Sequence, residues 1–291
     1  SPRLPPRSWK TRCFGFAVTD EDTWVLTHEY SGDVKRPIHA LGPRSLTLED
    51  PPGQVEKTLI PDVDSAVLLS NVLAPSETKQ LIALTERLGF LDFSPRKDTT
   101  LPSCHMVVCD ELLSTIFARF AAHLPPGERD SRAEAFNGRW RIYKYGMNAT
   151  FRPHVDGGWP YQGLTKEGEL KDVFSSQRFT QMTCLLYLND DFDGGETTFF
   201  SSRIPGKLAV SAKVTAKAGS ALCFFHGGHP ASPWHEGSPV LQGTKYIVQS
   251  DLVFSTLPDY AVIYGTMNLF SYANRALAKA IGDLQDRSES S

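Results

Sequence analysis

The spacing of apolar residues predicts two helices in the first half of the chain. After Pro75, apolar side chains recur at helical spacing until Gly89, a residue suited to ending a helix. A second helix is expected over residues 110–124, because its apolar positions fall on one side and a Pro-Pro-Gly sequence follows. Strands are expected upstream, at residues 13–18, 23–27 and 62–72.

From Trp140 onward the pattern changes to short alternating segments separated by glycine-rich turns. Strands are predicted at residues 141–145, 179–188, 197–200, 207–214, 221–225 and 245–254. Many short strands preceded by two helices indicate a mainly β fold with flanking helices, of the α+β class. We expect a double-stranded β-helix, which is a cupin-like jelly-roll barrel, buttressed by the N-terminal helices.

Three segments are expected along the chain. Residues 1–60 are rich in Pro, Arg and turn formers and form an N-terminal extension, residues 61–258 form the main domain, and residues 259–291 pack on that domain. The last segment includes an amphipathic helix over 270–284. The Gly-rich and charged segment from Trp159 to residue 177 is expected to be a mobile loop, and a lid over a substrate is its functional interpretation.

Charge and composition exclude some partners. The chain has 30 basic and 33 acidic residues, so no strong field favours nucleic acid or an anionic membrane. Apolar runs are too short for a membrane span. The five cysteines include no CxxC pair and are interpreted as reduced thiols, which favours a cytoplasmic or nuclear location. Because the start lacks both a methionine and the apolar core of a secretion signal, we expect it to be trimmed.

A candidate metal site is formed by His154, Asp156 and His235. On a strand, residues two apart point to the same side, so His154 and Asp156 can supply two ligands from one segment. Two imidazoles and one carboxylate form the facial triad of non-haem Fe(II) oxygenases. His226 and His229 compete with His235 as the third ligand, because all three lie in one turn-rich segment.

Lys245 begins the last predicted strand and shares a face with Ile247 and Gln249. An inward-facing ammonium needs an anionic partner or loses its proton. The carboxylate of a bound cosubstrate would be such a partner, whereas a surface lysine would need none.

Several linked segments resemble the 2-oxoglutarate and Fe(II)-dependent dioxygenases, specifically their prolyl-4-hydroxylase-like branch. The resemblance covers roughly residues 65 to 256 and rests on Tyr145-Gly146, Phe151–Asp156, Thr183–Asn189, Gly194–Thr197 and the ten-residue spacing from His235 to Lys245. It implies that His235 is the third iron ligand and that Lys245 pairs with the distal carboxylate of 2-oxoglutarate. It also implies that Tyr145, Thr183 and Tyr187 assist in that pocket, although buried aromatic residues could serve the core alone.

The resemblance further implies the reaction. Fe(II), 2-oxoglutarate and dioxygen, with ascorbate as a candidate reductant, would hydroxylate an unactivated C–H bond of a prolyl or other amino-acid residue and release succinate and CO2. Trp159, Trp234 and Gln249 are candidate contacts for a peptide, protein or small-molecule substrate. The alternatives are the same chemistry on a small metabolite, a zinc or manganese jelly-roll hydrolase or isomerase, and a silent binding barrel. The oligomeric state is not predicted.

Overall fold

A computed structural model describes residues 22–254, apart from 32–33, 52, 94–100, 128–129, 160, 165–167, 169, 174–178 and 202–208. The predicted strand at 13–18, the helix at 270–284 and the segment 259–291 lie outside the described residues. In the described part, no helix combines the length and the apolar character needed to cross a bilayer.

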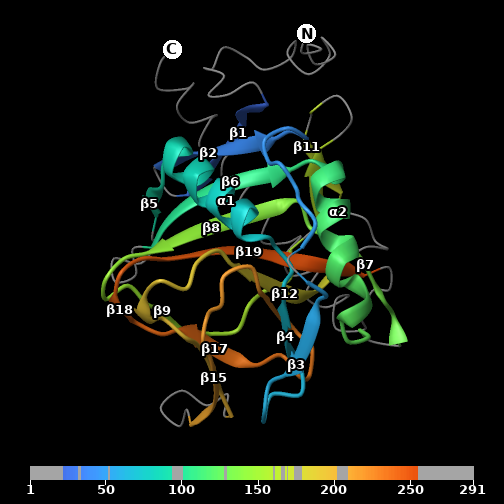
Figure 1. Cartoon of the computed structure of the whole chain (residues 1–291), viewed down its shortest axis with the longest axis vertical. Helices are drawn as coiled ribbons and strands as arrows, with labels where there is room; N and C mark the ends of the chain where they lie inside the picture. Colours follow the sequence, from blue (N-terminus) through green and yellow to red (C-terminus); the bar gives the residue numbers. More distant parts are fainter. Residues whose placement is uncertain are drawn as a thin grey trace, which may run out of the picture.

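A large mixed sheet forms the centre of the molecule (Figure 1). Its strand order is β1-β2-β6-β8-β19-β12-β16-β4-β3, with β5 added beside β6 and β7 beside β19. The strands are β1 (Thr23–Ser31), β2 (Val34–Leu41), β3 (Glu56–Leu59), β4 (Ala66–Ser70), β5 (Leu91–Phe93), β6 (Leu101–Val108), β7 (Ala133–Phe136), β8 (Arg139–Tyr145), β12 (Phe179–Tyr187), β16 (Ala221–Phe225) and β19 (Lys245–Phe254).

A smaller antiparallel sheet has the order β15-β14-β17-β9. Its strands are β9 (Phe151–His154), β14 (Thr197–Phe200), β15 (Val210–Val214) and β17 (Trp234–Gly237). Two short pairs complete the described strands, β10 (Tyr161–Leu164) with β11 (Leu170–Val173) and β13 (Asp193–Gly194) with β18 (Val240–Gln242).

The two faces of the large sheet bury different cores. Leu185 and Tyr187 of β12 pack with residues of the small sheet such as Phe199, so the two sheets enclose an interior. The alternate residues Cys184 and Leu186 face the other way, into the core that also holds α1 (Pro75–Leu88) and α2 (Asp110–Phe120). This two-sheet arrangement with helices against one sheet confirms the predicted jelly-roll fold class (Figure 1).

Three elements differ from the sequence-based expectation. The second helix ends at Phe120 and continues as the 3-10 turn Ala121–His123, because Pro125 and Pro126 limit further helix. The segment predicted as a loop from Trp159 instead contains the hairpin β10–β11, in which Tyr161 pairs with Val173. The expected strand at 62–72 is confined to β4, since turns precede it.

The described part of the N-terminal extension belongs to the large sheet. Strand β2 pairs in parallel with β6, and β3 pairs with β4. Ile38 and Leu41 of β2 are buried in the same core as both helices. These strands therefore share a core with the main domain.

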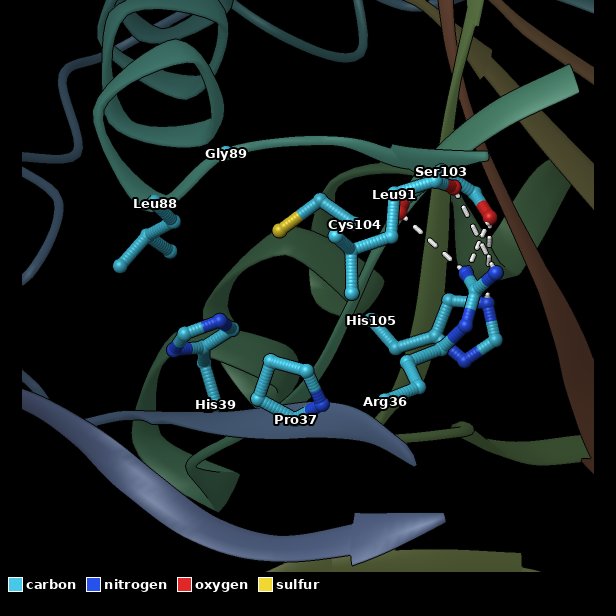
Figure 2. Close-up of a pocket in the computed structure, with 9 residues that line it drawn as sticks. All are labelled: Arg36, Pro37, His39, Leu88, Gly89, Leu91, Ser103, Cys104 and His105. Carbon is cyan, nitrogen blue, oxygen red and sulfur yellow. Dashed lines mark hydrogen bonds between the residues drawn. The ribbon is translucent and has the colours of Figure 1, made fainter. Parts of the chain in front are cut away.

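A cavity of about 90 Å³ lies at the β2 and β6 end of the large sheet (Figure 2). Strands β9 and β17 lie in another part of the molecule (Figure 1). On one side of the cavity the buried Arg36 donates hydrogen bonds to the backbone and hydroxyl of Ser103 and to the carbonyl of Leu91. His39 and Cys104 line another part of its wall. Because the guanidinium is occupied by these bonds, Arg36 fastens β2 and β5 to β6.

Candidate active site

Three side chains that could hold a metal ion converge where β9 and β17 run side by side. His154 and His235 are direct partners in this antiparallel ladder. Asp156 follows β9, and its two oxygens lie 3.2 Å from His154 Nε2 and 3.5 Å from His235 Nε2. The three ligand atoms lie within 4.8 Å of one another. Two imidazoles and one carboxylate on the same side fit an Fe(II) ion that keeps open coordination positions.

Both imidazoles are oriented by backbone carbonyls. His154 Nδ1 donates to the carbonyl of Arg152 at 2.7 Å, and His235 Nδ1 donates to that of Pro233 at 3.3 Å. A proton on Nδ1 leaves Nε2 as the lone-pair nitrogen, and both Nε2 atoms face Asp156. The tautomers are thus set for metal binding.

Asp156 is held by three neighbouring groups besides the histidines. Thr183 Oγ1 donates to Oδ2 at 2.7 Å, and Gln249 Nε2 donates to Oδ1 at 3.2 Å. The backbone N–H of Gly227 donates to the carbonyl of Asp156 at 2.7 Å. Such bonds to a ligating carboxylate fix its orientation.

The charges at this centre suit a cation. Burial alone would raise the pKa of Asp156, but His235 and the hydrogen bonds from His154 and Thr183 outweigh it and hold the pKa well below its usual range. Burial lowers the pKa of His235 to about 4. Burial also acts to lower the pKa of His154, but its hydrogen bond to Asp156 raises it overall. A bound divalent cation would replace the proton shared by that pair.

Lys245 lies in the interior between the sheets and is 1% exposed. Its Nζ donates to the carbonyl of Gly195 at 2.5 Å and lies 5.1 Å from the ring centre of Tyr145 and 5.5 Å from that of Tyr187. In the described part of the chain no carboxylate forms an ion pair with it. The side chain therefore faces inward, as the strand alternation predicted.

The interior between Lys245 and the triad runs along β19. Gln249 contacts Asp156, and Lys245 lies four residues earlier on the same face, about 13 Å away along the strand. Ile247 and Leu185, both buried, line the stretch between them. The interior thus has a carboxylate and two imidazoles at one end and an ammonium with two phenols at the other.

Not all of the candidate cosubstrate residues lie together. Tyr145 is the ladder partner of Lys245, and the Tyr187 ring centre lies 5.5 Å from Lys245 Nζ. The hydroxyl of Tyr187 forms a hydrogen bond with that of Thr197 at 2.8 Å. Thr183 instead lies at the other end, with its hydroxyl on Asp156. The sequence expectation had placed Thr183 with the lysine, and the four-residue separation from Tyr187 along β12 accounts for the difference.

The remaining candidates occupy different surroundings. Trp159 is 41% exposed and covers the guanidinium of Arg141 at 4.6 Å. Trp234 precedes His235 on β17, so it faces the opposite side of the small sheet. His229 stacks on Phe225 at 3.8 Å. His226 is buried, with Nδ1 3.4 Å from the hydroxyl of Thr183.

Arg141 was not singled out from the sequence. It is 8% exposed on β8 and lies 3.7 Å from Asp251 of β19. Alternation along β8 places Arg141 on the same face as Tyr143 and Tyr145, a signal that could have identified it.

Comparison with known proteins identifies one family. Residues 140–250 match the family model described as the 2OG-Fe(II) oxygenase superfamily. The matched range includes all three triad residues and Lys245. A comparison with curated protein sequences found no match.

Solved structures similar to this chain include three prolyl hydroxylases. A viral collagen prolyl hydroxylase from Paramecium bursaria Chlorella virus-1 is 15% identical with a TM-score of 0.41, covering 66% of this chain and 97% of that one. A Pseudomonas putida prolyl-4-hydroxylase is 18% identical with a TM-score of 0.40, covering 67% and 94%. A Trichoplax adhaerens prolyl hydroxylase, in complex with a hypoxia inducible factor peptide, is 14% identical with a TM-score of 0.43, covering 67% and 85%.

Proposed function

We propose that this chain, which carries a domain of the 2OG-Fe(II) oxygenase superfamily, hydroxylates an unactivated C–H bond of a prolyl or other amino-acid residue. Its iron ligands are His154, Asp156 and His235. The observation that carries the proposal is the shared interior, with a convergent triad at one end and a buried ammonium at the other.

The protein side chains prepare the metal position. The two Nε2 atoms and the Asp156 carboxylate supply three ligands, and Thr183 and Gln249 hold the carboxylate in place. When bound, Fe(II) with 2-oxoglutarate and dioxygen supplies the oxidising power for C–H hydroxylation, with release of succinate and CO2. Ascorbate is the proposed reductant that keeps the iron ferrous.

Lys245 is proposed to bind the distal carboxylate of 2-oxoglutarate. A buried ammonium paired with a carboxylate forms a strong, charge-assisted hydrogen bond. Tyr145 and Tyr187 flank the ammonium with their rings, and their phenols can add hydrogen bonds to the same carboxylate. Leu185 and Ile247 exclude water from the stretch between the lysine and the metal.

The proposed substrate is an amino-acid residue of a peptide or protein. Trp159 and Gln249 are its proposed contacts near the triad, since Gln249 bonds Asp156 and Trp159 is partly exposed. Trp234 remains a low-ranked candidate because it faces away from His235.

The test combines metal spectroscopy with substitution. Under anaerobic conditions, Fe(II) plus 2-oxoglutarate is expected to give a visible charge-transfer band in the wild type. Asp156→Ala and His235→Ala should lose this band and all succinate formation, because each removes a ligand, whereas the exposed Asp64→Ala should retain both. Turnover retained by either ligand variant would refute the assignment. Tight zinc binding with hydrolytic activity and no band would favour the zinc enzyme instead.

A further inference from the structure

A second group of ionisable side chains lies beside the triad. Arg141 of β8, Asp251 of β19 and His226, which follows β16, are 8%, 1% and 1% exposed. We call these three residues the Arg141 cluster. Asp251 reaches this place because it is the ladder partner of Thr183, whose hydroxyl contacts Asp156.

Short contacts link the cluster to the triad. Arg141 Nη2 lies 3.7 Å from Asp251 Oδ2, and His226 Nδ1 lies 3.5 Å from Asp251 Oδ1. The same Nδ1 is 3.4 Å from Thr183 Oγ1. One hydroxyl group therefore separates the cluster from a proposed iron ligand. On the outer side, the partly exposed ring of Trp159 covers the guanidinium.

Among the residues that the structure describes, each member of the cluster has a buried polar atom that finds no hydrogen-bond partner. These atoms are Arg141 Nε, Asp251 Oδ2 and His226 Nε2. A buried polar group without a hydrogen bond destabilises the folded state, so three such groups in neighbouring side chains are unusual unless something else bonds them. Arg141 Nε–H is a donor, and Asp251 Oδ2 is an acceptor. His226 Nε2 is a second acceptor when Nδ1 carries the proton toward Asp251.

The charge of the cluster restricts what can satisfy these atoms. The guanidinium lies beside the carboxyl group of Asp251, whose pKa burial raises to about 7, and burial keeps His226 neutral by lowering its pKa to about 4. A carboxylate placed here would be repelled by the Asp251 carboxylate, and an ammonium would be repelled by the Arg141 guanidinium. A neutral group that has both an N–H and a C=O meets neither repulsion and offers a partner to each charge.

We infer that the Arg141 cluster recognises an amide of the substrate that carries an N–H, with Arg141 donating to its carbonyl oxygen and Asp251 accepting from its N–H. This inference rests on the proposed function, since it names the group that lies next to the oxidised carbon. The amide can come from the peptide backbone or from a side-chain carboxamide, and the two sources share this chemistry.

The test uses small blocked amino acids as probes. Each of the twenty amino acids is offered to the enzyme, loaded with Fe(II) and 2-oxoglutarate, as the methylamide, the dimethylamide and the free acid of its N-acetyl, N-methyl derivative. The N-methyl group, which proline does not need, removes the N–H on the acetyl side. The dimethylamide lacks the N–H, and the free acid carries a negative charge. Succinate release measures turnover, and calorimetry under nitrogen measures binding without turnover.

At least one methylamide is expected to stimulate succinate release by the wild type. The dimethylamide and the free acid of the same amino acid should bind at least about tenfold more weakly, which is the equivalent of one charge-assisted hydrogen bond. Asp251→Asn should reduce this discrimination several-fold, while the exposed control Asp64→Asn keeps it. Arg141→Met combined with Asp251→Leu removes both charges together, which is better tolerated than removing one. That double variant should lose the discrimination in the calorimetric assay even if turnover also falls.

The outcomes separate this inference from the proposed function. If the wild type forms no succinate with or without probes, the oxygenase proposal fails. If it forms succinate but treats the three probe types alike, the amide inference alone is overturned, and ordered water would account for the unsatisfied atoms. A response confined to the Asn and Gln probes, whatever their backbone methylation, supports recognition of a side-chain carboxamide. Binding of probes made from other amino acids, if it requires the backbone N–H, supports recognition of a peptide-bond amide.

Discussion

Lys245 holds a titratable charge in a place where burial disfavours it. Burial lowers its pKa to about 8, and Glu196 opposes this only in part. Above that pH the cosubstrate-free enzyme loses the ammonium that 2-oxoglutarate is proposed to need. The apparent affinity for 2-oxoglutarate should therefore be constant below about pH 8 and fall by up to about tenfold per pH unit above it. Binding measured by anaerobic titration between pH 6.5 and 9.5 checks this.

An arginine at the same position supplies the control. Lys245→Arg keeps its charge throughout this range, so its affinity for 2-oxoglutarate, although lower, should not change with pH. Lys245→Ala should raise the 2-oxoglutarate requirement far more than it weakens iron binding. An unchanged requirement in Lys245→Ala would remove the lysine from the pocket.

Thr183 lies at the metal end of β12, whereas Tyr187 on the same strand lies at the Lys245 end. The Thr183 hydroxyl bonds Asp156 and lies away from Lys245, so Thr183→Val should weaken iron affinity by about 10–100-fold, as expected for a group that orients a ligand. At saturating iron, the 2-oxoglutarate requirement should change by less than about twofold. The exposed Thr58→Val of β3 should change neither. The reverse pattern would return Thr183 to the cosubstrate pocket that the family resemblance implies.

At the scale of elements, one buried ion pair joins α1 and α2 to the N-terminal segment. Arg119 contacts both oxygens of Glu77 at 2.8 Å, and Glu77 also accepts the backbone N–H groups of Glu49 and Ala74. Glu77→Ala should lower the free energy of unfolding by roughly 3–5 kcal/mol, because Arg119 is left buried without its partner. The exposed pair of Glu86 and Lys144 has the same 2.8 Å separation, yet Glu86→Ala should cost less than about 1 kcal/mol. Urea denaturation compares the two variants, and equal losses would contradict the role given to burial.

Element boundaries could be predicted where the pattern is unbroken. Strands β14, β16 and β19 begin and end at the predicted residues, because alternating or continuous apolar runs are bounded by glycines and polar turns. The first helix likewise ends at Gly89, whose φ of 89° suits glycine. The hairpin β10–β11 was missed because its short strands carry Gln, Gly, Lys and Asp, whereas the equally short β14 is made of Thr and Phe.

The candidate site could be predicted only in part, for a related reason. The two-residue spacing brings His154 and Asp156 together even though β9 ends at His154. The pairing of His235 with His154 is a tertiary register, and local periodicity does not encode which distant strands become neighbours. The same limit applies to Arg141 and Asp251, whose contact arises because β8 pairs with β19.

At the scale of the whole molecule, the domain boundary predicted at residue 60 is crossed by the sheet. Strand β2 lies against β6, and the backbone N–H of Cys109 donates to the carbonyl of Leu41 just before α2 begins. Leu41 is fully buried in the core that holds both helices. The N-terminal strands should therefore unfold together with the main domain and share its stability.

Two leucines of the N-terminal segment test this shared stability. Leu41→Ala should destabilise the whole protein by about 2–5 kcal/mol, because it opens a cavity in the common core. Leu59, on β3, is 68% exposed, so Leu59→Ala should have little effect. The measurement is thermal unfolding followed both by far-UV circular dichroism and by loss of succinate formation. If the N-terminal strands form a separate unit, Leu41→Ala will leave the temperature at which activity is lost unchanged. If they share the core, both readouts will fall together, by about 2–4 °C for each kcal/mol.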